Sequence, residues 1–198
     1  MTSEKSGSPR GKPKGDKRER TRAALLEAAR ALVRESGYER TTLEKVARRA
    51  GMTTGAIYGN FKSRDELFIA LGQTYWAPVA PKVAPGATFA DAMHALAKAT
   101  LAAVDDRAPA AIGRLTGLAY TLKNAELRSR VVEITKSSYE FGAGWLRGFD
   151  PTELPMPPDN LVRVIHALIE GLVMQRILTP ELCPEEVFYA AFAALARR

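Results

Sequence analysis

The chain has 198 residues, 46% of them hydrophobic and 26% charged, and a formal net charge of +7. This length allows one large domain, or a small domain joined to a larger one, with a real apolar core. The lone cysteine, Cys183, excludes an intramolecular disulfide and a cysteine metal cluster, and no apolar run reaches the roughly 18 residues of a membrane span. Because a basic start with no apolar stretch behind it is not a signal peptide, we expect a cytoplasmic protein.

The positive charge is unevenly distributed. All of the excess lies in residues 1–70, whereas residues 71–198 are neutral overall. A basic module beside a neutral one indicates that one end binds a polyanion and the other has a different task. The alternative is a basic end that only aids solubility.

Two segments open the chain. Residues 1–15 mix Ser, Gly, Pro and Lys without apolar periodicity, which predicts a disordered basic arm. From Asp16, which has capping-box spacing with Glu19, apolar residues recur at helical intervals. They continue to Gly37, which offers a C-cap for the first helix.

Two short helices follow. Thr41 or Thr42 caps the first of them, Gly51 turns the chain, and Thr53 caps the second. Short helices joined by a glycine turn are typical of a helix-turn-helix. We therefore predict a DNA-binding domain over residues 16–62.

The second short helix has few large side chains. Ile57 and Phe61 are expected to anchor it, and its small outer residues would let the backbone enter a major groove only about 12 Å wide. Phosphates would be reached by side chains and by the positive ends of the capped helices. The predicted DNA contacts are Thr42, Thr53, Thr54, Gly55, Ala56, Tyr58, Asn60, Lys62 and Arg64. A tight helical corner without a ligand is the alternative.

The rest of the chain also has helical spacing. Ser63 and Glu66 form a capping box that opens a connecting helix over residues 63–76. Prolines and cap residues divide residues 77–198 into further helices, over about 89–104, 109–123, 124–147 and 159–178, and from 184. The fold class is therefore all-α, with about nine helices in total.

A ligand pocket is harder to locate from the sequence, and we look for it in residues 76–198. Bulky or polarizable residues on the central helices are typical of apolar ligand cavities, although most such residues belong simply to a core. His94 and His166 could orient a polar group of the ligand or could be structural. The candidates for effector contact are Trp76, Met93, His94, Tyr120, Phe141, Trp145 and Met174, with Tyr139 beside them.

The last two helices are apolar on more than one side. Such helices are buried on more than one side, and a second copy of the chain would bury the additional face. The predicted dimer interface comprises Leu161, Ile165, Leu168, Leu172, Phe188 and Phe192. The alternative is a helix at the centre of a monomeric bundle.

One stretch also resembles a known family. It carries, in order, Gly37-Tyr38, Thr41-Thr42, Val46-Ala47, Ala50-Gly51, Gly55-x-x-Tyr58 and Phe61-x-Ser63. Over about residues 17–67 the chain resembles the DNA-binding domain of the TetR family of bacterial repressors. The resemblance implies an all-helical homodimer that pairs through its last two helices, binds a palindromic operator and is released by a small molecule in a C-terminal pocket.

We therefore expect a ligand-responsive transcriptional regulator, most simply a repressor, whose partners are double-stranded operator DNA, a small effector and a second copy of the chain. An architectural or activating DNA-binding protein without an inducer is the main alternative. An enzyme is less well supported, because the sequence lacks a P-loop, a dinucleotide-binding glycine motif, a nucleophile elbow and a zinc-protease motif. No metal or cofactor is expected.

Overall fold

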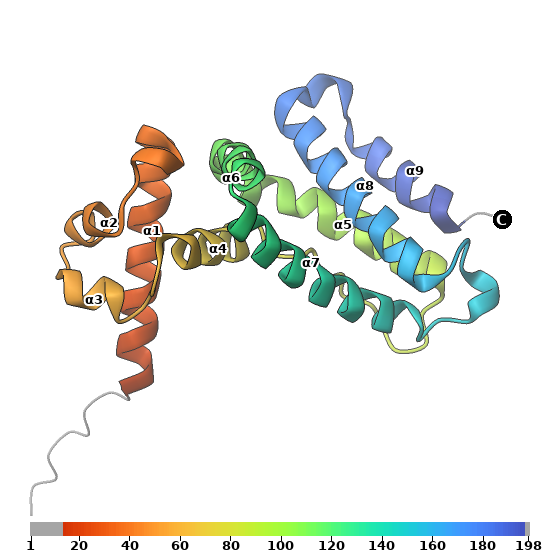
Figure 1. The fold of residues 1–198 in the computed structure, drawn as a ribbon. Helices are drawn as coiled ribbons and strands as arrows, with labels where there is room; N and C mark the ends of the chain where they lie inside the picture. The colour runs from red at the N-terminus through yellow and green to blue at the C-terminus, as the bar shows by residue number, and fades with distance from the viewer. Residues whose placement is uncertain (1–13, 197–198) are drawn as a thin grey trace, which may run out of the picture. The chain divides into compact units, whose positions relative to one another are not determined.

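A computed structural model of the protein describes residues 14–196, and these residues form an all-α fold (Figure 1). Contacts divide the chain into two compact units, one up to Leu67 and one from Phe68 onward. The boundary lies inside α4 (Arg64–Tyr75), which therefore contributes its first turn to one unit and the remainder to the other. The all-α prediction is confirmed.

The first unit contains α1 (Lys14–Arg40), α2 (Leu43–Arg49) and α3 (Thr54–Tyr58). The helical path of α1 is interrupted at Gly37, whose φ of 79° and ψ of 168° lie outside the helical region. Gly51, with φ of 66°, turns the chain between α2 and α3. Both positions favour glycine because a side chain strains a backbone with positive φ.

The helix starts of this unit follow the predicted caps. The hydroxyl oxygen of Thr42 accepts a hydrogen bond from the Lys45 amide at 3.3 Å, and that of Thr53 accepts one from the Ala56 amide at 3.2 Å. The first helix begins earlier than predicted, since Lys14 and the residue after it are helical. The other thirteen residues of the predicted basic arm, 1–13, lie outside the described residues.

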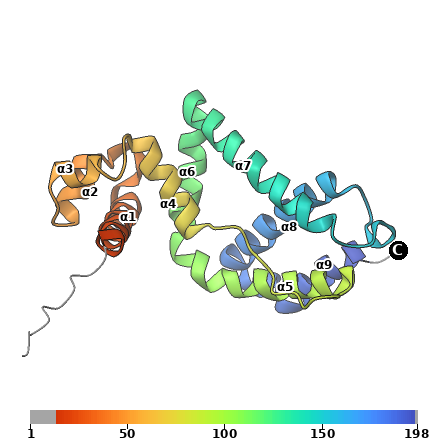
Figure 2. The same cartoon turned by 90° about the horizontal axis from the view of Figure 1, so that it is seen from below.

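The second unit contains α5 (Phe89–Arg107), α6 (Ala111–Lys123), α7 (Ala125–Leu146), α8 (Pro158–Leu178) and α9 (Glu185–Ala196). In both views α5, α8 and α9 lie side by side, and α7 runs along α8 (Figures 1 and 2). Short 3-10 turns precede α6, α8 and α9, at 108–110, 151–153 and 180–182. The predicted capping box of Thr88 and Asp91 is present, and Asn124 caps α7.

An apolar core holds these helices together. Its fully buried members come from α5, α7, α8 and α9 and include Phe89, Met93, Leu146, Leu161, Val173, Phe188 and Phe192. The helices α7 and α8 approach closely at Gly142, where a Cβ atom would lie 2.6 Å from Cγ2 of Val162. Glycine is therefore required for the observed separation of α7 and α8. Within the described residues, no helix combines the length and apolar character that crossing a bilayer requires.

Candidate functional site

The short helix α3 is anchored by buried side chains on one side and carries small exposed side chains on the other. Ile57 and Phe61 are completely buried, as predicted, so they attach the helix to its unit. On the outer side Thr54 and Gly55 are exposed and carry little bulk. A flat partner can therefore approach the backbone of α3 closely.

Arg22 of α1 secures the chain just beyond α3. Its guanidinium lies 4.3 Å from the centre of the Phe61 ring and donates a hydrogen bond of 3.0 Å to the carbonyl oxygen of Asn60. Sequence reasoning did not single out Arg22, because its partners are 38 residues away in the chain. This contact fixes α1 against the end of α3.

The nine predicted DNA contacts divide by exposure. Five are exposed, namely Thr53, Thr54, Gly55, Tyr58 and Lys62. The other four are half-buried, namely Thr42, Ala56, Asn60 and Arg64. The exposed five surround the outer side of α3 and its two ends, so this part of the prediction describes one continuous surface.

Two of the half-buried residues are directed inward. The side-chain amide of Asn60 donates a hydrogen bond of 2.8 Å to the carbonyl oxygen of Ala56, and its own oxygen is buried. The guanidinium of Arg64 donates to the carbonyl oxygen of Tyr38. Asn60, which was predicted on the outer face, and Arg64, which was predicted to reach a phosphate, therefore each satisfy a backbone carbonyl of their own domain.

A carboxylate also lies on the outer surface. The hydroxyl of Tyr58 donates a hydrogen bond of 2.8 Å to Glu44, which raises the pKa of Tyr58. The pKa of Glu44 is lowered, first by its own backbone amide and then by the hydrogen bonds from Tyr58 and Thr42. Glu44 was not predicted, and it adds a negative charge to this surface beside Tyr58.

Exposed cations surround the same unit. Lys17 and Arg18 project from α1, and Lys45 and Arg48 project from α2. Lys45 also donates a hydrogen bond of 2.8 Å to the carbonyl oxygen of Arg40. The sequence showed this charge only as an excess in the first third of the chain, and the structure places part of it on two helices of the first unit.

The predicted effector residues occupy several different environments in the second unit. Met93 is completely buried in the core and Met174 packs against it. Three other predicted effector residues pack against neighbouring rings. The ring centroids are 5.8 Å apart for Tyr120 and Phe68, 5.0 Å for His94 and Tyr189, and 5.2 Å for Trp145 and Phe149. These residues stabilise helix packing at separate places.

Phe141 was assigned wrongly. Its side chain is 84% exposed on α7, so it does not line an internal cavity. A pocket of about 320 Å³ instead lies beside the 3-10 turn before α8. None of the seven predicted effector residues lines it. Its lining residues are Arg147, Phe149, Pro151, Leu154, Met156, Pro157 and Pro158.

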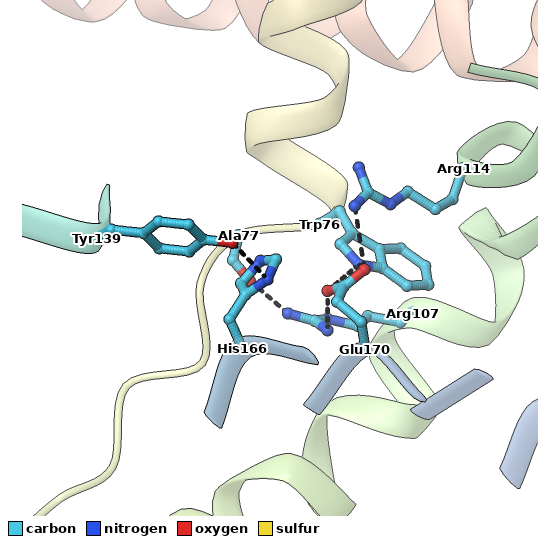
Figure 3. Close-up of polar contacts among 7 residues, drawn as sticks. All are labelled: Trp76, Ala77, Arg107, Arg114, Tyr139, His166 and Glu170. Carbon is cyan, nitrogen blue, oxygen red and sulfur yellow. Dashed lines mark hydrogen bonds and ion pairs between the residues drawn. The ribbon is translucent and has the colours of Figure 1, made fainter. Parts of the chain in front are cut away.

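Trp76, the first predicted effector residue, belongs to a central polar cluster with Arg107, Arg114 and Glu170 (Figure 3). The Glu170 carboxylate accepts hydrogen bonds from the indole N–H of Trp76 at 2.7 and 2.9 Å and from Arg114 at 3.0 Å. It also lies 3.4 Å from Arg107, which donates to the carbonyl oxygen of Ala77 at 2.6 Å. Both guanidinium groups lie over the indole ring, at 4.9 and 5.5 Å from its centre.

A neutral pair lies next to the central polar cluster. Tyr139 of α7 and His166 of α8 are within hydrogen-bonding distance at 3.4 Å, and Figure 3 shows them facing each other. The pKa of His166 is lowered chiefly by burial, against the raising effect of Glu170, and the two nearby arginines lower it further. The uncharged imidazole is therefore favoured beside the cluster.

Most of the predicted dimer face is already covered within the chain itself. Leu161, Ile165 and Leu172 of α8 and Phe188 and Phe192 of α9 are buried inside their own chain, and only the sixth residue, Leu168, is half-buried. These side chains pack within the core that α8 and α9 share with α5. Apolar spacing identified buried faces of α8 and α9 but could not indicate that their cover comes from the same chain.

Comparison with known proteins gives these features a context. Residues 25–71 match the family model of bacterial regulatory proteins of the tetR family. An HTH-type transcriptional repressor, AcnR of Corynebacterium efficiens, is 36% identical over 69 residues, which are 35% of this chain and 37% of that protein. The transcriptional regulator TtgR of Pseudomonas putida is 47% identical over 51 residues, 26% of this chain and 24% of that protein. The chain thus matches well under half the length of these two curated relatives.

A solved structure extends the similarity over the whole fold. NalD, the secondary repressor of the MexAB-OprM multidrug efflux pump in Pseudomonas aeruginosa, is 27% identical. The match has a TM-score of 0.61 and covers 89% of this chain and 94% of that chain. Both units of the present structure therefore have counterparts in that repressor.

Proposed function

Because this chain belongs to the TetR family of bacterial regulatory proteins, we propose that it represses transcription by binding a palindromic operator as a homodimer, from which a small effector releases it. The observation that carries this proposal is the exposed, small-residue face of α3 above two fully buried anchors. The family and the matched relatives are regulators of transcription, which decides against the enzyme alternative. A protein that acts on chromosomal DNA works in the cytoplasm.

The proposal divides the chain by task. Residues 16–62 read DNA, residues 63–76 connect, and residues 77–198 pair with a second copy and bind the effector. In the major groove Thr54 would meet base edges, because it is exposed on α3 and its hydroxyl can donate or accept. Lys62 and Tyr58 would contact phosphates, and Tyr58 would exchange its hydrogen bond to Glu44 for one to DNA.

A corrected dimer face follows from the exposed side of α8 and α9. Exposed or half-buried small and apolar residues recur there, mostly at intervals of three and four, which is the spacing of a helix-pairing seam. The set comprises Val164, Ala167, Leu168, Gly171 and Leu178 on α8 and Val187, Ala190 and Ala194 on α9. We propose that a second copy covers this face in a two-fold arrangement.

The effector would act by a shift of populations. A dimer presents two α3 helices, which must fit major grooves about 34 Å apart. An effector that binds more tightly to a conformation with a different α3 spacing draws the dimer into that conformation. The affinity for the operator then falls by at most the ratio of the effector's affinities for the two conformations. Operator and effector therefore oppose each other.

The DNA-reading role is tested by two substitutions with a matched control. A preferred duplex is first selected from a random pool, and affinities for it and for random DNA are then measured by fluorescence anisotropy. Thr54→Ala should change preference among sequences by about 1–3 kcal/mol. Lys62→Ala should weaken binding to all duplexes alike and reduce the salt slope by about one unit, whereas Lys98→Ala on α5 should do neither.

Equal loss of specific and random binding in Thr54→Ala and Lys62→Ala would show that α3 does not read sequence. Selection of no preferred duplex would support an architectural protein instead.

The corrected dimer face is tested at Ala167. Both Ala167 and Ala102 are exposed alanines on long helices, but only Ala167 lies on the proposed face. Ala167→Glu places an unpaired charge in the interface and should give a helical monomer in sedimentation velocity, while Ala102→Glu stays dimeric. A dimeric Ala167→Glu protein would place the interface elsewhere.

A further inference from the structure

The central polar cluster of Trp76, Arg107, Arg114 and Glu170 carries more positive than negative charge. Two guanidinium groups face one carboxylate, which leaves a formal excess of one positive charge. Arg107 of this cluster is only 4% exposed. An excess charge in so dry a place is costly unless an anion compensates it.

The donors of the cluster are incompletely used. Within the described residues, Nε of Arg114 is buried without a hydrogen-bond partner. Arg107 has only one weak contact to the carboxylate, at 3.4 Å, and directs its other nitrogen to the Ala77 carbonyl oxygen. Burial lowers the pKa of Arg107, Glu170 acts against this, and Arg114 lowers it further. A second hydrogen-bond acceptor beside Glu170 would therefore stabilise both guanidinium groups.

The cluster is dry on one side and open on the other. Arg107 is buried beneath the indole of Trp76, whereas the side chains of Arg114 and Glu170 are 28% and 25% exposed. Figure 3 shows Tyr139 and His166 on one side of Glu170 and the indole with Arg114 on the other. Aromatic rings thus lie on both sides of Glu170, and a flat apolar body beside an anionic group matches this arrangement.

We propose that the effector carries a compact anionic group, a carboxylate or a phosphate, which binds Arg107 and Arg114 by taking the place of the Glu170 carboxylate. Planar guanidinium groups bind such anions through paired hydrogen bonds, so an anion outside the chain can reproduce the contacts that Glu170 makes now. The apolar body of the effector would lie against Trp76 and Tyr139. This inference rests on the proposed function in treating the ligand as the effector.

The same exchange would free the end of α4. The indole N–H of Trp76 donates to both carboxylate oxygens of Glu170, and Trp76 directly follows the last residue of α4. When the Glu170 carboxylate leaves, Trp76 loses both hydrogen bonds. The first turn of α4 belongs to the unit that contains α3, so the exchange acts on the chain segment that joins the two units.

The test uses probes that differ in charge at similar size. Phenylacetate, phenyl phosphate and the neutral phenylacetamide are titrated into the full-length protein by isothermal titration calorimetry. We expect at least one anion to bind at least tenfold more tightly than the amide. The preference between carboxylate and phosphate identifies which anion the site accepts.

Three variants locate the binding. Arg114→Gln should remove the preference for the anion, and Lys123→Gln, an exposed cation on the same helix, should leave it intact. Glu170→Gln should strengthen anion binding severalfold, because it removes the competing carboxylate and keeps the shape of the side chain. A merely structural role for Glu170 predicts the opposite. Circular dichroism checks that each variant is folded.

The proposal is overturned if Glu170→Gln binds neither anion more tightly than the amide, or if Arg114→Gln retains the preference. These outcomes differ from a failure of the proposed function. If anions bind as described but leave affinity for the selected duplex unchanged, the anion site stands and ligand-controlled release is wrong.

Discussion

Replacing Gly142 with alanine should force α7 away from α8. The new Cβ atom would lie 2.6 Å from Cγ2 and 3.8 Å from Cβ of Val162, whereas carbon atoms in contact lie about 3.5–4.0 Å apart. Val162 must therefore change rotamer, or the helices must separate by about 1 Å. Val162 is half-buried and branched at Cβ, so few alternative rotamers are available to it in a helix.

Two opposing terms set the size of the effect. Overpacking a contact of this kind costs about 1–3 kcal/mol, and alanine in place of glycine stabilises a helix interior by about 1 kcal/mol. The free energy of unfolding should therefore fall by up to about 2 kcal/mol. Gly144 is the matched control, because it lies in the same helix, is exposed, and would give a Cβ atom nothing within 4 Å.

Urea denaturation followed by circular dichroism measures both variants. Gly144→Ala should stabilise the protein by about 0.5–1 kcal/mol. Adding Val162→Ala to Gly142→Ala should remove the penalty, since the clashing methyl is gone. If Gly142→Ala were as stabilising as Gly144→Ala, the close approach of α7 and α8 would be refuted, and with it the fixed spacing between Tyr139 and His166.

Three further predictions concern single side chains. Phe61→Ala should lower the free energy of unfolding by about 3–5 kcal/mol in urea titrations, because the ring is completely buried under α3; a loss below about 1 kcal/mol would contradict its anchoring role. Tyr58→Phe should raise the pKa of Glu44 toward its ordinary value, as followed by NMR titration, since one hydrogen bond to the carboxylate is lost, and an unchanged pKa would mean that this bond is absent in solution. Burial lowers the pKa of His166, so the unfolded chain holds that proton more tightly, and stability should fall as the pH drops below about 6.5; His166→Gln should reduce this slope in urea titrations, and an equal slope would assign it to other groups.

The caps were predictable because they depend on neighbours in the chain. Thr53, Thr88 and Asn124 each accept a hydrogen bond from an amide three residues later, so residue type and spacing contain the whole interaction. The anchors Ile57 and Phe61 were predictable for a similar reason, since they are large apolar residues in a stretch of mostly small and polar ones.

Faces and clusters were not predictable in the same way. Apolar spacing marks a buried face of α8, but it does not show that Leu161 and Ile165 are covered by helices of their own chain. The central polar cluster joins Trp76 to Glu170 across 94 positions of sequence, and no local pattern connects them. Asn60 was predicted to point outward and form hydrogen bonds with DNA. Its side-chain amide instead donates to the carbonyl oxygen of Ala56, one turn earlier.

The contact of Arg22 with the end of α3 bears on how the helix meets a polyanion. The carbonyl oxygens at the C-terminal end of any helix carry partial negative charge, which phosphate groups repel. The guanidinium of Arg22 covers the carbonyl oxygen of Asn60 at 3.0 Å, and its position over the Phe61 ring keeps it there. Arg22 thus places a positive charge from α1 just beyond the C-terminal end of α3, the end opposite its capped, electropositive start.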